Sequence, residues 1–260
     1  MANYYYVGTY LPSLSFDLAP EITLARLELL LQDNLTPADY EKTKILRRFY
    51  DILNLRSLWL GEEFDPFGEM KIFEIGEALI SNQGLPAYVY EFIESNPLKE
   101  DRIRHFPFLV TKFFQSGKEI RDPFLRHYLN FERELRLVMT ALRAKKLNRN
   151  LAEELQFEDP EEAFIAELFA IKDFKAEDLP DNYKEIKVIF DKYGDEPLAL
   201  QKAIDEYRFN KIDQLVELSD TFSIERILAY LAQFIIVQKW FELDNDKGIR
   251  MVETLVKDIA

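Results

Sequence analysis

The chain of 260 residues contains no cysteine, only two histidines and only eight glycines. The absence of cysteine excludes disulfides, thiolate metal sites and cysteine nucleophiles. With so few histidines, a zinc site would have to rely on carboxylates. The glycines lack the spacing of a P-loop or a dinucleotide-binding turn, and no serine lies in a strand-turn-helix elbow. We therefore expect no catalytic residue, no metal, no cofactor and no small-molecule substrate.

Positive charge and long apolar runs are also scarce. The chain has 33 Lys and Arg against 47 Asp and Glu, a net charge of −14, which argues against a general nucleic-acid binder. The most apolar stretch, Ile227 to Phe241, is interrupted by polar residues and is shorter than the roughly 20 residues of a spanning helix. The N-terminus has no positive region and does not resemble a secretory signal. These features predict a soluble protein without a membrane anchor.

Helical periodicity dominates what is present. Apolar residues make up 48% of the chain, and most of the eleven prolines lie at the start of a periodic segment, where a missing N–H costs little. Alternating strand patterns are almost absent; the stretch Tyr4 to Tyr10 suits either an extended segment or the start of a helix. The sequence predicts an all-α fold with little or no sheet. We expect helices near residues 21–33, 37–60, 68–81, 86–95, 106–116, 119–147, 160–171, 181–193, 197–218, 223–243 and 246–258.

The stretch from Thr36 to Gly61 has the most complete set of helix signals. Thr36 can accept a hydrogen bond from an early N–H, a proline follows it, and Gly61 can adopt the left-handed conformation that ends a helix. Three polar residues, Asp51, Asn54 and Arg56, lie among its apolar neighbours. These residues either form hydrogen bonds with one another between packed helices or contact a partner protein.

A second long helix is expected from Lys118 to Leu147, in which Pro123 marks either a kink or the true start. A shift of 83 residues superimposes it on the first and aligns Asp51 with Glu134. This match indicates either an internal repeat or only the shared pattern of amphipathic helices. We expect a single all-α body over residues 1–260; a true repeat would divide it into serial sub-bundles near 1–95, 96–170 and 171–260.

Charge is distributed unevenly along the chain. Residues 99–149 hold thirteen Lys or Arg and six Asp or Glu, whereas residues 150–206 hold seventeen acids and six bases. In one interpretation the two tracts are solvated faces that attract one another inside the fold. In the other, the basic tract forms a ridge that faces an acidic partner protein or anionic lipid headgroups. The basic ridge is defined by six residues: Arg133, Arg136, Arg143, Lys145, Lys146 and Arg149.

Three blocks resemble a known family: the opening YYYVGTYLPSLSF, then FYDILNLRSLW, then FERELRLVMTALRAKKL. They are similar to an uncharacterised bacterial family encoded among V-type (A-type) ATP synthase subunits. That family resembles a divergent form of the archaeal-type C subunit, the relative of the d subunit of eukaryotic V-ATPases, in which a helical pattern runs Asp-x-x-Asn-Ile-x-x-x-Leu-Arg. Asp51, Asn54 and Leu55 match this pattern, whereas Leu60 replaces the arginine. In the second block Glu134 takes the acidic place and Leu137 replaces the asparagine.

The resemblance implies a funnel of similar helical bundles that sits on the membrane rotor ring and receives the central stalk. It implies no catalytic residues. The partners would be the stalk and rotor-ring subunits, and the protein would lie peripherally on the cytoplasmic face of the inner membrane without inserting. The leading hypothesis is therefore a coupling subunit of a V/A-type rotary ATPase. The alternatives are a helical adaptor that binds an acidic partner through the basic ridge, and an enzyme with a carboxylate-bound metal.

Overall fold

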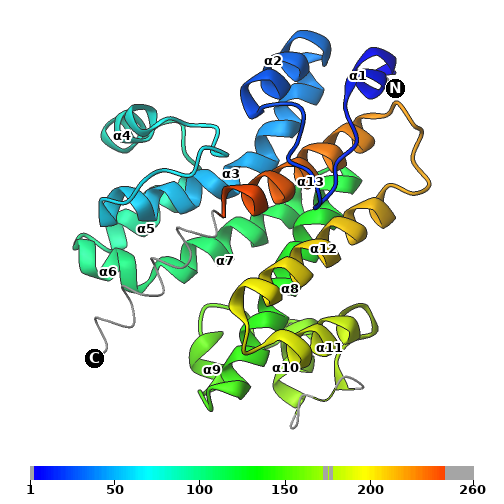
Figure 1. Ribbon diagram of the computed structural model, residues 1–260. Helices are drawn as coiled ribbons and strands as arrows, with labels where there is room; N and C mark the ends of the chain where they lie inside the picture. The colour runs from blue at the N-terminus through cyan, green and yellow to red at the C-terminus, as the bar shows by residue number, and fades with distance from the viewer. Residues whose placement is uncertain (1–2, 172–174, 176–177, 244–260) are drawn as a thin grey trace. The chain divides into compact units, whose positions relative to one another are not determined.

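The computed structural model describes residues 3–171, 175 and 178–243 (Figure 1). Within these residues it contains thirteen α-helices and no β-strand, which confirms the predicted all-α class. The chain divides into two compact units, which we call unit 1 (residues 1–40 and 201–260) and unit 2 (residues 41–200). The units do not follow consecutive thirds of the chain. The single body, the sub-bundles and the funnel of the C-subunit type stay predictions.

Unit 1 is formed by the two ends of the chain. Most side chains between Ile227 and Val237 are buried. The backbone N–H of Tyr4 donates to the carbonyl of Phe222 at 2.8 Å. The side-chain hydroxyl of Tyr4 donates to the carboxylate of Asp39. The N-terminal segment is thereby fastened to the start of α3. The helices are α1 (Tyr5–Tyr10), α2 (Leu24–Asn34), the first turn of α3 (Pro37–Leu60), most of α12 (Pro197–Leu215) and α13 (Ile224–Glu242).

Unit 2 contains the rest of α3 and the helices that follow it. One apolar cluster of this unit joins α3, α4, α5, α7 and α8, and its fully buried members include Ile52, Leu55 and Leu109. Each such residue contributes about 1.5–3 kcal/mol by leaving water. In Figure 1, α9, α10 and α11 lie around α8, which contacts all three. The elements are α4 (Ile72–Ser81), α5 (Ala87–Ser95), α6 (Lys99–Arg104), α7 (Phe106–Ser116), η1 (Gly117–Glu119), α8 (Pro123–Lys146), α9 (Leu151–Glu154), α10 (Ala163–Ala170), η3 (Asp181–Tyr183) and α11 (Lys184–Tyr193).

The predicted ends of the first long helix are confirmed. The N–H of Asp39 donates to the hydroxyl of Thr36 at 3.3 Å. Gly61 adopts a φ of 78°, and its N–H reaches the carbonyl of Ser57 at 2.8 Å. This left-handed conformation suits glycine because it carries no Cβ.

The predicted helix starts at residues 68 and 119 precede the observed starts by about one turn. The helix expected at 68–81 begins at Ile72, because the residues before it fold back onto α3. The helix expected at 119–147 begins at Pro123, so of the two alternatives for this proline the true start is confirmed; the carboxylate of Asp122 accepts the N–H of Leu125 at 3.1 Å and caps the helix. The short helices α6 and α9 were not predicted. The ambiguous N-terminal stretch is helical as α1, and the helix expected near 246–258 lies outside the described residues.

Candidate protein-interaction site

One face of α3 binds the loop that follows it. Arg47, Asp51 and Asn54 occupy positions i, i+4 and i+7, which lie on the same side of a helix. Asn54 forms a two-way contact with the backbone of Asp65: its amide nitrogen donates to the carbonyl at 3.0 Å, and its amide oxygen accepts the N–H at 2.8 Å. The N–H and carbonyl groups of the loop backbone, which belong to no helix, thus obtain hydrogen-bond partners from the side chain of Asn54. We call this arrangement the α3 clamp.

Arg47 and Asp51 complete the clamp. The guanidinium of Arg47 donates to the carbonyls of Phe67 and Gly68 and to the carboxylate of Glu69. The carboxylate of Asp51, only 4% exposed, accepts the N–H of Met70 at 2.9 Å. Burial raises the pKa of Asp51 to about 6, although the backbone N–H groups and the charge of Arg47 act in the opposite direction.

The clamp requires glycine at position 68. A Cβ there would lie 2.7 Å from the side-chain nitrogen of Asn54 and 2.8 Å from a carboxylate oxygen of Asp51. Both distances are too short for non-bonded atoms, so the loop could not approach α3 this closely with any larger residue. The backbone comes near enough to be bound because Gly68 has no side chain.

The clamp sets the position at which α4 begins. Met70 is two residues before the helix, and the carboxylate of Glu74 accepts the N–H of Lys71 at 2.6 Å, which closes the first turn. Ile75 and Ala78 on the inner side of α4 are buried, and Ile75 joins the same cluster as Ile52 of α3. α4 is therefore held by apolar packing on one side and by the clamped loop at its N-terminus.

The outer side of α4 is apolar and exposed. Ile72, Phe73 and Ile80 expose 57%, 62% and 88% of their surface. An apolar helix face left in water is a typical mark of a protein-binding surface. Residues 61–85 also hold six acids and one base, so acidic side chains accompany this face. We call the three residues and the helix that carries them the α4 face.

Arg56 is separate from the clamp, although the sequence groups it with Asp51 and Asn54. Its side chain is 45% exposed and lies 3.8 Å from the carboxylate of Glu62. Asp51, Asn54 and Arg56 therefore do not serve as hydrogen-bond partners for one another. Asp51 and Asn54 instead bind loop backbone, and a role of any of the three in binding a partner stays a prediction.

The basic ridge divides into a buried half and an exposed half. Arg133 is 1% exposed, and its guanidinium binds the carboxylates of Glu158 and Glu162. Glu158 is also buried and accepts from the hydroxyl of Thr111 at 2.7 Å and from Arg136 at 3.3 Å. These pairs join the basic tract to the acidic tract inside the fold, but Arg133 and Glu158 are buried and are not the solvated faces that the first interpretation of the charge pattern described. Arg133 is therefore not part of an exposed surface.

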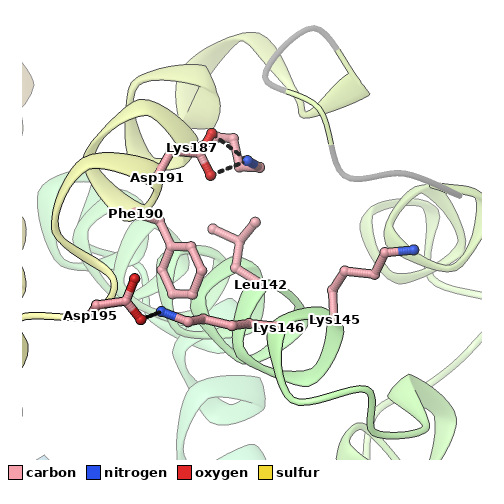
Figure 2. A pocket seen from close by; sticks show the side chains of 7 residues that line it. All are labelled: Leu142, Lys145, Lys146, Lys187, Phe190, Asp191 and Asp195. Atoms are coloured by element: carbon pink, nitrogen blue, oxygen red, sulfur yellow. Dashed lines mark hydrogen bonds and ion pairs between the residues drawn. The ribbon is translucent and has the colours of Figure 1, made fainter.

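The exposed half lies at the C-terminal end of α8, beside a cavity of about 290 Å³ (Figure 2). Lys146 binds Asp195 at 2.6 Å, and Lys187 of α11 binds Asp191. Figure 2 shows Lys145 extending away from both pairs. Because each acid offsets a lysine, the cavity is less positive than the sequence of α8 suggests.

The remaining members of the ridge are also exposed. Arg143 is exposed near the end of α8, and Arg149 lies beyond it, 3.3 Å from the carboxylate of Glu154. Their role in binding a partner stays a prediction.

Metal-binding and membrane-spanning features are absent from the part of the chain that the structure describes. There, no group of three or more metal-ligating side chains is gathered. No described helix is both long enough and apolar enough to cross a membrane.

Sequence reasoning found Asp51 and Asn54 but not what they bind. It missed Arg47, Gly68 and the exposed outer side of α4. The spacing of Arg47 to Asp51 and Asn54 was an available signal, since the three share one helical face. No local pattern shows that a loop folds back onto that face.

Comparison with known proteins places the chain in a family. It belongs to the family described as "Protein of unknown function (DUF2764)", whose model matches residues 1–260. An uncharacterized protein of Chlamydia pneumoniae is 27% identical and covers 100% of this chain and 99% of its own length. A second, from Chlamydia trachomatis, is 26% identical over 96% of this chain and 100% of its own length. No solved structure matches the chain. The predicted membership of an uncharacterised bacterial family is confirmed.

Proposed function

We propose that this protein is a non-catalytic coupling subunit of a V/A-type rotary ATPase that links the central stalk to the membrane rotor ring. The observation that carries the proposal is the α4 face, an exposed apolar helix surface held in place by the α3 clamp. The clamp contains Asp51 and Asn54, the two polar residues that match the helical pattern of the archaeal-type C subunit. A protein that couples stalk to ring needs such a surface on a well-anchored helix because it transmits force through protein contacts.

The partner of the α4 face is, in this proposal, a basic amphipathic helix of a stalk protein. Two helices bind by packing apolar sides together, while charges at the rim select the partner. The surroundings of α4 are acidic, so a helix with Lys or Arg beside its apolar stripe is complementary. The protein would then act at the cytoplasmic face of the inner membrane, bound to other subunits and not inserted in lipid.

Co-purification tests this proposal. The tagged full-length protein is expressed with the stalk and rotor-ring subunits of its own organism, and the bound subunits are quantified. The proposal expects stalk and ring subunits to be recovered. Ile80→Glu should reduce recovery at least tenfold, because burying an isoleucine is worth about 1.5–3 kcal/mol and a buried unpaired charge costs more.

Leu218→Glu is the matched control, since Leu218 is fully exposed in unit 1 and lies outside the α4 face. Recovery of none of the subunits by the unmodified protein would refute the coupling function. Recovery by Ile80→Glu equal to that of Leu218→Glu would refute only the role of the α4 face.

A second candidate is a helical adaptor that binds an acidic partner through the exposed half of the basic ridge. The cluster of exposed bases at the end of α8 favours it. Charge reversal of Arg143, Lys145 and Lys146 should abolish that binding and leave binding through α4 intact. Unchanged affinity in the charge-reversal variant would eliminate this candidate.

A further inference from the structure

Unit 1 contains a cavity of about 430 Å³ that none of the functions above uses. One wall is a face of α13 that carries Arg226, Tyr230 and Gln233. α12 contributes Asp213, and the segment that follows α1 lines another part of the cavity with apolar side chains such as Leu11. This volume lies in the range of small-molecule sites, about 300–1,000 Å³.

The polar face of α13 is unusual for its surroundings. Arg226, Tyr230 and Gln233 follow the spacing i, i+4 and i+7, so they share one side of a helix that is otherwise largely buried and apolar. Gln233 is 6% exposed and satisfied, because its amide donates to the carbonyl of Phe209 at 3.1 Å and to the carboxylate of Asp213 at 2.9 Å. These contacts fix one end of the polar face.

Two donors on this face have no acceptor. The hydroxyl oxygen of Tyr230 and the Nε of Arg226 are buried and form no hydrogen bond within the described residues. Arg226 is nevertheless held in place, since its Nη2 donates to the carbonyls of Glu217 at 3.1 Å and Ser219 at 3.4 Å. Buried donors nearly always have a partner, and both of these belong to residues that line the cavity, so a ligand in the cavity can supply the acceptor.

The residues that line the cavity indicate which kind of acceptor suits these two donors. Burial and the negative charge of Glu21 raise the pKa of Tyr230, so its hydroxyl stays protonated and donates. Arg226 adds a positive charge, and an anionic oxygen forms the strongest hydrogen bonds with these donors. Asp213 of α12 lines the cavity and Glu21 acts on Tyr230, and these two negative charges disfavour ligands with two or more negative charges, such as phosphate.

We infer that this cavity binds a small monocarboxylate with an apolar body, whose carboxylate accepts from Tyr230 and Arg226 while its apolar part contacts residues such as Leu11 and Ile227. The site lies wholly within unit 1 and does not depend on the α4 face. The inference therefore stands or fails independently of the coupling function.

Isothermal titration calorimetry on the full chain tests it with three matched probes. 4-Methylpentanoate carries the carboxylate and the apolar body, 4-methylpentan-1-ol carries only the body, and inorganic phosphate carries only the anionic charge. We expect measurable binding of the carboxylate and at least tenfold weaker binding of the other two. No carboxylate binding at 10 mM, or equal binding of the alcohol, would overturn the inference.

Variants locate the site. Tyr230→Phe removes one oxygen and should weaken carboxylate binding about tenfold, whereas Arg226→Lys keeps the charge and should weaken it less than Arg226→Gln. Tyr88→Phe is the matched control, because the hydroxyl of Tyr88 is also buried without a partner but lies in unit 2. Circular dichroism verifies that each variant is folded. Carboxylate affinity of Tyr230→Phe equal to that of Tyr88→Phe would also overturn the inference.

Discussion

Replacement of Gly68 by alanine tests whether the α3 clamp depends on close backbone approach. The added Cβ would lie 2.7 Å from the nitrogen of Asn54 and 2.8 Å from the oxygen of Asp51, well inside van der Waals contact. Both side chains are buried and hydrogen-bonded to the loop, so neither can rotate away without losing a partner. The loop must therefore move out by several tenths of an ångström.

The expected loss of stability follows from two contributions. Overpacking at a close contact costs about 1–3 kcal/mol. Weakening the hydrogen bonds of Asn54 and Asp51 to the loop adds about 1 kcal/mol, since each typical bond contributes about that much. Gly68→Ala should therefore destabilise unit 2 by about 2–4 kcal/mol.

Gly76→Ala is the control, because it makes the same chemical change within α4. A Cβ at Gly76 would have no atom within 4 Å, and alanine favours a helix over glycine by about 0.8–1 kcal/mol. This variant should be slightly stabilised. The two substitutions differ in sign although the added methyl group is identical.

Urea unfolding and amide hydrogen exchange measure the difference. Exchange at Asp65 and Met70, whose N–H groups bind Asn54 and Asp51, should accelerate by a factor of about 30 or more in Gly68→Ala, since 1.4 kcal/mol corresponds to a factor of ten. If the unfolding free energies of the two variants agreed within about 0.5 kcal/mol, the reasoning about close approach would be wrong.

Two further predictions concern buried charges. Because the pKa of Asp51 is about 6 in the fold and 3.8 in the reference state, the fold binds the proton more tightly, and stability should fall as pH rises from about 4 to about 6. The difference corresponds to about 3 kcal/mol, since one pKa unit is 1.36 kcal/mol. Asp51→Asn should remove this decline in urea unfolding measured from pH 4 to 7; an identical pH profile would refute the assignment. Arg133→Met should cost about 3 kcal/mol, because it removes the closest cationic partner of the buried Glu158 and leaves only the longer contact with Arg136. Lys118→Met removes an exposed partner of Glu162 and should cost less than about 1 kcal/mol, so similar losses in both variants would count against the buried cluster.

Local signals predicted much of the secondary structure. The caps at Thr36 and Gly61 act between residues a few positions apart, and such contacts can be read from a single segment. The starts of α4 and α8 were less accurate, because apolar periodicity continues into residues 68–71 and 119–122. At α4 the tertiary contact with α3 competes with the helix and prevails.

The candidate site was predicted in part. Asp51 and Asn54 were identified as polar residues inside an apolar pattern, which requires partners for them. Their partners are backbone groups of a loop with no sequence motif of its own, so they were not predictable. The exposed side of α4 was missed for a related reason: apolar residues cover more than one side of this helix, and the sequence does not show which of them a neighbouring element covers.

The sequence by itself determined the all-α class, the ends of α3 and the lack of the common catalytic motifs, because each depends on composition or on neighbouring residues. Only the tertiary structure decided that Arg133 is buried while Arg143 and Arg149 are exposed, and that Gly68 approaches two polar side chains. The physical reason is that burial depends on contacts between residues distant in the chain. An arginine beside Glu158 and one facing water occupy similar places in a helical pattern, and only the fold distinguishes them.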